Sequence, residues 1–177
     1  MNAATRAFVT LLAVVGAGCD SPAAEWTQAN GYRWRPLKVD GDASGFTPLS
    51  ARRTGVDFQN QVSDSLLLGN RNLGQGAGVA IGDVDGDGLP DVFLARTEGC
   101  SALYRNLGDW KFEEIAQRAG VAACDRNSTG AAFVDFDGDR DLDLVLLATR
   151  GPNAVFVNDG HAAFTERRDA GIDSTGK

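Results

Sequence analysis

The hydrophobic residues of this chain come in short runs separated by glycine, asparagine and aspartate. Four runs, at 78–82, 91–96, 102–106 and 111–115, are apolar and rich in strand-forming residues. Such runs are typical of β-strands joined by tight turns. The 22 glycines and single methionine agree with this, because glycine favours turns over long helices. The pattern predicts an all-β fold with at most a helical turn at 116–119.

The strand pattern recurs with an offset of 52 residues. Residues 78–87 align with 130–139, and 91–94 align with 143–146. Each unit closes with an aromatic residue, a polar stretch and a Gly-aliphatic pair, an element that also occurs upstream at 46–56. Tandem units of four short strands are typical of β-propeller blades. A β-sandwich is the rival fold, but sandwiches rarely repeat one acidic loop at constant spacing.

The first residues have the pattern of an export signal. A single arginine precedes an apolar run at 7–15, which is shorter than the roughly 20 residues that span a bilayer. Small residues and Cys19 follow, an arrangement that resembles a bacterial lipobox, although Gly16 stands where that pattern prefers an aliphatic residue. We expect a signal peptide at 1–18 and lipidation of Cys19. The alternative is ordinary cleavage at a nearby small residue, and either route exports the protein to the periplasm or cell surface.

These patterns divide the chain into three parts. They are a signal peptide at 1–18, a lipid-anchored tether and lead-in at 19–45, and propeller blades at 46–177, the last comprising a partial unit at 46–77 and full units at 78–129 and 130–175. The expected architecture is thus a partial propeller of four-stranded antiparallel blades. In the lead-in, Trp26, Tyr32 and Trp34 are expected to cover an edge of the first blade rather than to bind a ligand.

Charge is concentrated at two places along the chain. The net charge is −7, from 24 acidic and 17 basic residues, a sign that disfavours nucleic acid as a partner. Nine aspartates lie within 83–91 and 135–143. Such local crowding of carboxylates favours a metal site over a generally acidic surface.

Both acidic stretches place aspartates at positions 1, 3, 5 and 9 and a backbone carbonyl at position 7. The predicted ligands are Asp83, Asp85, Asp87, the Leu89 carbonyl and Asp91 in the first loop, and Asp135, Asp137, Asp139, the Asp141 carbonyl and Asp143 in the second. Calcium takes roughly six to eight oxygens, which such a loop helps to supply. Two carboxylates about 4 Å apart repel by roughly 4 kcal/mol at an effective dielectric constant near 20. We therefore expect two calcium sites.

Other interpretations of the acidic stretches fit less well. Exposed Asp-Gly turns would not recur in register, and an EF-hand needs a glutamate at position 12, where Leu94 and Leu146 stand. Magnesium retains its waters and suits an all-protein site less. Position 6 calls for a positive φ, which Gly88 adopts freely and Arg140 adopts at a cost of about 1–2 kcal/mol. On this basis the first site should bind more tightly.

The remaining cysteines, Cys100 and Cys124, lie in polar loops. In an oxidising compartment such thiols pair, and a disulfide closing this span would add about 3 kcal/mol of stability. We hypothesise that they form a disulfide.

Several segments resemble known families. Residues 78–91 and 130–139 resemble FG-GAP or VCBS repeats, the calcium-loop blades also found in integrin alpha propellers. The flanking segments 31–37, 45–47, 54–58 and 103–108 resemble bacterial members of the cartilage-acidic-protein-like, ASPIC/UnbV-associated family. That resemblance implies a propeller followed by a C-terminal ASPIC/UnbV region, so we expect this chain to be an N-terminal fragment of a longer lipoprotein. The family's role is mostly adhesion or ligand binding outside the cell.

Catalytic motifs are not evident. The single histidine, His161, follows an Asn-Asp-Gly turn and is interpreted as a solvated turn residue, and neither His-Glu-x-x-His nor Gly-x-Ser-x-Gly occurs. We expect no enzyme activity but an extracytoplasmic calcium-binding propeller module for adhesion to an extracellular protein or glycan. It would meet the membrane only through its lipid anchor. The alternative is the accessory propeller of a larger secreted enzyme whose catalytic part is absent from this chain.

Overall fold

The computed structural model describes residues 26–35 and 46–172, in two compact units that divide after Phe46. The predicted signal peptide at 1–18, the lipidation site Cys19 and most of the lead-in fall outside the described residues. Within the described part, no helix has the length and apolar character needed to cross a membrane.

The described part of the first unit is a β-hairpin. Strands β1 (Thr27–Ala29) and β2 (Tyr32–Trp34) pair antiparallel. Two guanidinium groups lie over the Trp26 ring, those of Arg33 and Arg35, each 4.9 Å from its centroid. Trp26, Tyr32 and Trp34 are exposed, and their predicted role in covering a blade edge stays a prediction.

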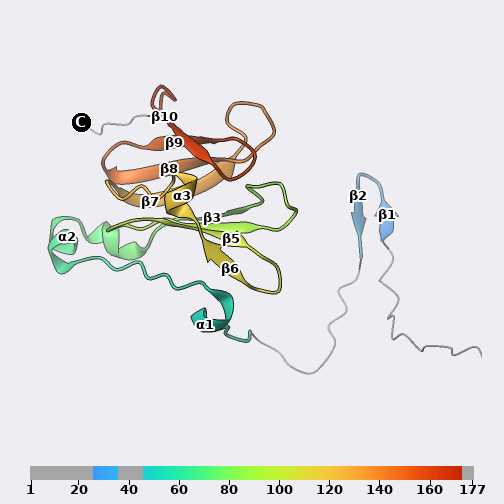
Figure 1. Cartoon of the computed structure of the whole chain (residues 1–177), viewed down its shortest axis with the longest axis horizontal. Helices are drawn as coiled ribbons and strands as arrows, with labels where there is room; N and C mark the ends of the chain where they lie inside the picture. The colour runs from blue at the N-terminus through green and yellow to red at the C-terminus, as the bar shows by residue number, and fades with distance from the viewer. Residues whose placement is uncertain (1–25, 36–45, 173–177) are drawn as a thin grey trace, which may run out of the picture. The chain divides into compact units, whose positions relative to one another are not determined.

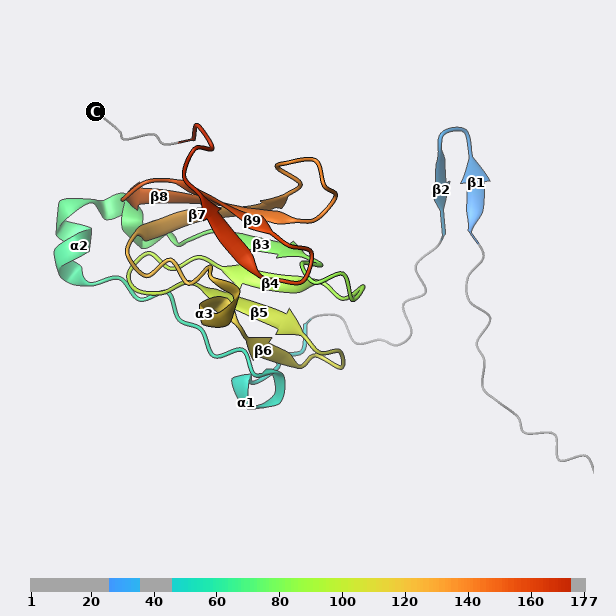
Figure 2. The ribbon, with the colours of Figure 1, turned by 45° about the horizontal axis from the view of Figure 1, so that its top comes forward.

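The second unit contains two four-stranded antiparallel sheets, stacked face to face (Figures 1 and 2). In the first, β3 (Val79–Gly82), β4 (Asp91–Leu94), β5 (Ala102–Asn106) and β6 (Phe112–Glu114) lie in chain order; in the second, β7 (Asn127–Val134), β8 (Asp143–Arg150), β9 (Ala154–Asn158) and β10 (Phe164–Arg167) do the same. Consecutive strands pair because each connection is a short turn or loop. The predicted four-stranded antiparallel units are confirmed, and the described residues form two such sheets rather than a closed propeller.

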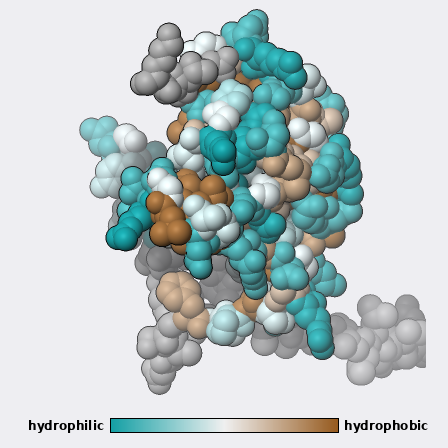
Figure 3. Space-filling model, turned by 90° about the vertical axis from the view of Figure 1, so that its left-hand side faces the viewer, coloured by the Kyte–Doolittle hydropathy of each residue, from teal (hydrophilic) through white to brown (hydrophobic). Residues whose placement is uncertain are grey.

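The remaining elements are short helical turns. They are α1 (Ala51–Thr54), α2 (Asp64–Gly69), the 3-10 helix η1 (Arg71–Gln75) and α3 (Ala116–Ala119), the last at the predicted position. Residues 46–77 contain no strand, so the predicted partial unit consists of helical turns and loops. Figure 3 faces the side on which α2 lies in Figure 1 and shows apolar patches among hydrophilic side chains.

A repeated glycine contact joins successive units. Gly55 ends α1 and Gly120 ends α3, both with φ of 81°. A Cβ on Gly120 would lie 2.7 Å from the carbonyl oxygen of Phe164, and a Cβ on Gly55 would collide with the carbonyl oxygen of Phe112. Because Phe112 and Phe164 are 52 residues apart, each helical turn packs in the same way on the outermost strand of the next sheet.

The core lies between the two sheets. Strand periodicity directs Phe93 and Leu103 from the first sheet toward Leu144, Leu146 and Phe156 of the second, and all five side chains are at most 3% exposed. Burying a side chain of this size contributes about 1.5–3 kcal/mol. The stacked sheets therefore hold the strand ends, and the loops between them, in place.

Candidate metal centres

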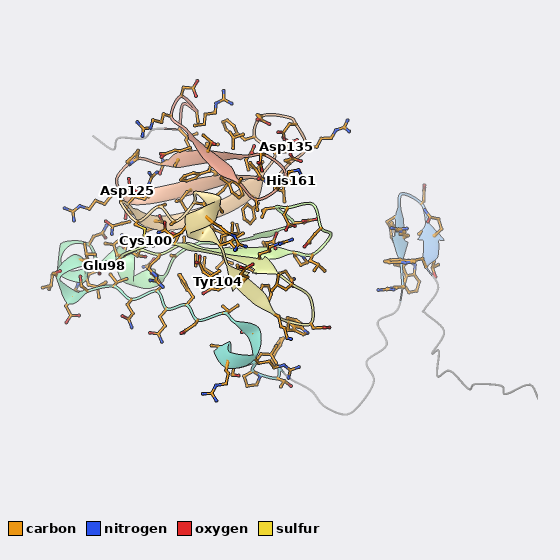
Figure 4. All side chains as sticks on the ribbon, in the orientation of Figure 1. Glu98, Cys100, Tyr104, Asp125, Asp135 and His161 are labelled. Atoms are coloured by element: carbon orange, nitrogen blue, oxygen red, sulfur yellow. A yellow bond between two sulfur atoms is a disulfide. The ribbon has the colours of Figure 1, made fainter. Side chains whose placement is uncertain are left out.

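The two acidic loops occupy equivalent places in the sheets. The first acidic loop (83–91) joins β3 to β4, and the second acidic loop (135–143) joins β7 to β8. Figure 4 shows Asp135 of the second loop and His161 at one end of the sheets, with Cys100 and Asp125 at the other.

Three of the predicted carboxylates come together in each loop. Asp83, Asp85 and Asp91 each offer one oxygen, and these oxygens all lie within 4.8 Å of one another. The corresponding residues of the second loop, Asp135, Asp137 and Asp143, form a group with the same limit. Positions 1, 3 and 9 thus converge in both repeats.

The carboxylate at position 1 organises the turn. In the first loop, Asp83 accepts hydrogen bonds from the backbone N–H groups of Gly86 and Gly88, both at 2.8 Å. In the second loop, Asp135 accepts from Gly138 at 2.7 Å and Arg140 at 3.2 Å. The loop backbone therefore wraps around this aspartate.

The carboxylate at position 9 is completely buried at the first residue of a strand. Asp91 accepts from the N–H groups of Val84 at 3.0 Å and Asn106 at 2.8 Å. Burial raises the pKa of Asp91 in spite of these bonds, and the charges of Asp85 and Asp87 raise it further. A neighbouring cation would offset both effects.

The second loop repeats this arrangement. Asp143 accepts from the N–H groups of Phe136 at 2.8 Å and Asn158 at 2.9 Å. Desolvation raises the pKa of Asp137, and the charges of Asp139 and Asp143 add to the rise. The acidic motif by itself does not point to Asn106 or Asn158, although their spacing of 52 residues matches the repeat.

Position 5 does not join the converging carboxylates. The carboxylates of Asp87 and Asp139 are not members of the three-carboxylate groups; each accepts the N–H group of the residue two further on, Leu89 and Asp141, at 2.9 Å. The regular spacing of positions 1, 3, 5, 7 and 9 cannot show that position 5 stays out of the group. The short side chain of an aspartate can accept a hydrogen bond from the backbone of its own loop instead. Ligation by the Leu89 and Asp141 carbonyls stays a prediction.

The two loops differ in their surroundings. Val84 of the first loop is covered by the β9–β10 turn, since its carbonyl accepts from Asn158 Nδ2 at 2.7 Å and from the N–H group of Ala162 at 3.1 Å. Val84 is 2% exposed, whereas its counterpart Phe136 is half-buried. The position-6 residues have the predicted positive φ, 86° for Gly88 and 82° for Arg140.

The donor set fits a hard divalent cation. Each group consists of carboxylate oxygens, without the imidazole or thiolate ligands that zinc and copper prefer. The position-9 aspartate of each group is buried, so water does not screen its charge. Backbone N–H groups already donate hydrogen bonds to the carboxylates at positions 1 and 9. The carboxylates at positions 1, 3 and 9 are therefore of a kind that could hold a hard divalent cation such as calcium.

The predicted cysteines lie at the other end of the sheets, whereas His161 lies next to the first acidic loop, in a hollow that Asp85 and Arg105 also line. Cys100 and Cys124 form a disulfide with an S–S distance of 2.08 Å, drawn beside the Cys100 label in Figure 4. It links the segment after β4 to the segment before β7. His161 is exposed in the β9–β10 turn, where its N–H group donates to Asp159 at 2.9 Å.

Two stacked four-stranded sheets, each with an acidic loop between its first two strands, define a tandem β-sheet repeat protein. Residues 83–146 match the FG-GAP-like repeat family. The segment is therefore similar to that family, as its acidic motifs predicted.

Curated relatives are cartilage acidic protein 1 from three vertebrates. The Xenopus tropicalis protein is 31% identical over 103 residues, which cover 58% of this chain and 16% of that protein. The Homo sapiens protein is 30% identical over 82 residues, 46% of this chain and 12% of that protein. The Mus musculus protein is 29% identical over 82 residues, 46% and 13% respectively. The matched segment spans less than a fifth of these relatives.

Proposed function

We propose that the two acidic loops bind one calcium ion each and that the bound ions stabilise a non-catalytic binding module outside the cytoplasm. The observation that carries this proposal is the repeated geometry of the loops. In both, a fully buried aspartate holds two backbone amides and converges with the carboxylates at positions 1 and 3. Solvated turns do not require a buried carboxylate, which is costly unless it is paired.

The role proposed for calcium is to tie strand ends together. Asp83 directly follows β3, and Asp91 begins β4. The Asp91 carboxylate also accepts the N–H group of Asn106 at the end of β5. A cation held by Asp83, Asp85 and Asp91 would supply positive charge at the junction of three strands. Calcium would in this way add to the stability of each sheet.

We further propose that the two sheets are blades of a larger propeller. Val79 and Ile81 are 53% and 66% exposed on β3, yet their counterparts Ala131 and Phe133 pack against the core between the sheets. Leu147 on β8 is 48% exposed, although its counterpart Ala95 is 2% exposed. The outward face of each sheet thus carries apolar residues at positions whose counterparts in the other sheet pack at the contact between the two sheets. This pattern supports a further blade packed on each outward face.

An exported setting agrees with the Cys100–Cys124 disulfide, since such bonds persist in oxidising compartments. We propose an extracellular protein or glycan as the partner and Cys19 as a lipid anchor. The alternative, an accessory propeller of a larger secreted enzyme, would need a catalytic domain in the same reading frame.

Calorimetric titration of the chain with calcium tests the metal assignment. We expect two binding events and a higher melting temperature in calcium than in chelator, because a ligand bound only by the folded state stabilises it by about 2.7 kcal/mol at a hundredfold excess over Kd. The D91N/D143N variant, which removes both buried charges, is the matched control and should lose both effects. A sample that is folded by circular dichroism yet binds no calcium would overturn the proposal.

A further inference from the structure

Arg105 brings a positive charge to the first acidic loop. It lies on β5, and its Nε is 2.5 Å from Oδ2 of Asp85, while Nη2 is 3.5 Å from Oδ2 of Asp87. The Asp85 side chain is only 9% exposed, and that of Arg105 is 38% exposed. Water therefore screens this ion pair less than it would screen a fully exposed one.

Within the part of the chain that the structure describes, the second loop has no such ion pair. The residue equivalent to Arg105 is Val157. Among the described residues, no lysine or arginine forms an ion pair with the carboxylates of the second loop. Arg167 stacks on Phe136 of that loop at 5.6 Å but pairs with Asp169, and Arg140 is exposed.

We infer that Arg105 is an internal counter-ion of the first acidic loop, so that calcium binds there more weakly than in the second loop and must displace the guanidinium from Asp85. The inference rests on the proposed calcium binding. Asp85 is one of the three converging carboxylates, and a carboxylate oxygen held by a guanidinium is less available to a metal. Positive charge next to the site also opposes the entry of a dication.

This order reverses the one expected from position 6 alone. Gly88 and Arg140 have nearly the same φ, 86° and 82°, so the strain at Arg140 belongs to the folding of the second loop. A cost paid in forming the loop lowers its stability rather than its affinity. The Arg105–Asp85 contact, by contrast, competes directly with the metal.

A calcium titration followed by amide NMR resolves the two loops in the intact chain. The N–H groups of Gly88 and Gly138 serve as probes, since both donate to the position-1 carboxylates. In the wild type, Gly138 should respond at lower calcium than Gly88. The R105V variant, which copies Val157, should lower the Gly88 midpoint by about two- to fivefold, the range for a partly exposed ion pair, and leave the Gly138 midpoint unchanged.

Two further variants make the test symmetrical. V157R should raise the Gly138 midpoint by a similar factor, and R105K, which keeps the charge, should stay close to the wild type. In chelator, R105V should melt about 1–3 °C lower than the wild type, and this gap should close in saturating calcium. The melting comparison detects the counter-ion role without relying on metal affinity.

The outcomes separate the two proposals. If both loops titrate and the Gly88 midpoint is the same in R105V as in the wild type, the counter-ion inference is wrong and calcium binding stands. If neither glycine responds in a folded sample of any variant, calcium binding fails, and the inference drawn from it fails too. A Gly88 response at lower calcium than Gly138 in the wild type would also contradict the inferred order.

Discussion

Buried aspartates are the residues on which both candidate sites depend. Asp91 and Asp143 are inaccessible to solvent, and each uses both carboxylate oxygens to accept backbone N–H groups from two different segments. Such a residue closes the loop on one side and fixes the end of a neighbouring strand on the other. Its charge is also the one that water cannot solvate, so a bound cation would stabilise this carboxylate more than the exposed ones.

Replacement of Asp91 by asparagine tests this dependence at the residue scale. The amide group would face two backbone donors with only one acceptor oxygen, so D91N should lower the free energy of unfolding by about 1–3 kcal/mol even in chelator. Urea unfolding in calcium and in chelator measures it. D87N is the matched control, because Asp87 lies outside the three-carboxylate group, and its loss should be smaller. Equal losses for the two variants would show that the buried carboxylate with two backbone donors is no more important to stability than an exposed one.

At the scale of elements, the helical turn and its terminal glycine act as a connector between sheets. The turn α3 carries the buried residues Ala116 and Ala119, and Gly120 lets the backbone pass close to β10. The turn α1 repeats the contact on β6 through Gly55. A Gly-aliphatic pair after a short polar stretch is therefore a packing motif, and its recurrence in the sequence has a structural cause.

The G120A variant tests the connector. Alanine at φ of 81° costs about 1–2 kcal/mol, and its Cβ must also push away the Phe164 carbonyl oxygen. The free energy of unfolding should fall by more than the strain alone. G171A is the control, since Gly171 has φ of 70° with open space around it and should lose only the strain. Similar losses in a thermal melt would mean that the close contact relaxes without cost.

At the scale of the whole molecule, two stacked sheets leave apolar surface on their outer sides. Ile81 is 66% exposed, whereas Phe133, its counterpart 52 residues on, packs against the core. The same sequence position is therefore partly buried in the second sheet and exposed in the first. This asymmetry follows from the number of sheets, not from the residues themselves.

Paired substitutions measure the asymmetry. I81A should change the free energy of unfolding by less than about 0.5 kcal/mol. F133A should lower it by more, about 1.5–3 kcal/mol, because it removes a partly buried side chain that packs at the contact between the sheets. Chemical denaturation of both variants gives the comparison. A large loss for I81A would show that its face is already covered in this chain.

Much of the fold could be predicted from the sequence because the relevant signals are local. Strand runs, the offset of 52 residues and the acidic positions 1, 3 and 9 each depend on a few neighbouring residues. A β-strand directs alternate side chains to one face, and a turn rich in aspartate and glycine closes on itself. The four-stranded units and the convergence of three carboxylates in each loop follow from these patterns.

Only the tertiary structure decided which distant groups meet. Arg105 reaches Asp85 because β5 lies beside β4, and Asn158 reaches Val84, 74 residues away, because the second sheet stacks on the first. Strand register and sheet packing set such contacts, and neither is encoded by the spacing within one loop. The sequence by itself determined two equivalent acidic loops. Only the packing of the strands and sheets placed the β9–β10 turn and the Arg105 guanidinium against the first loop, and left the second loop without an ion pair among the described residues.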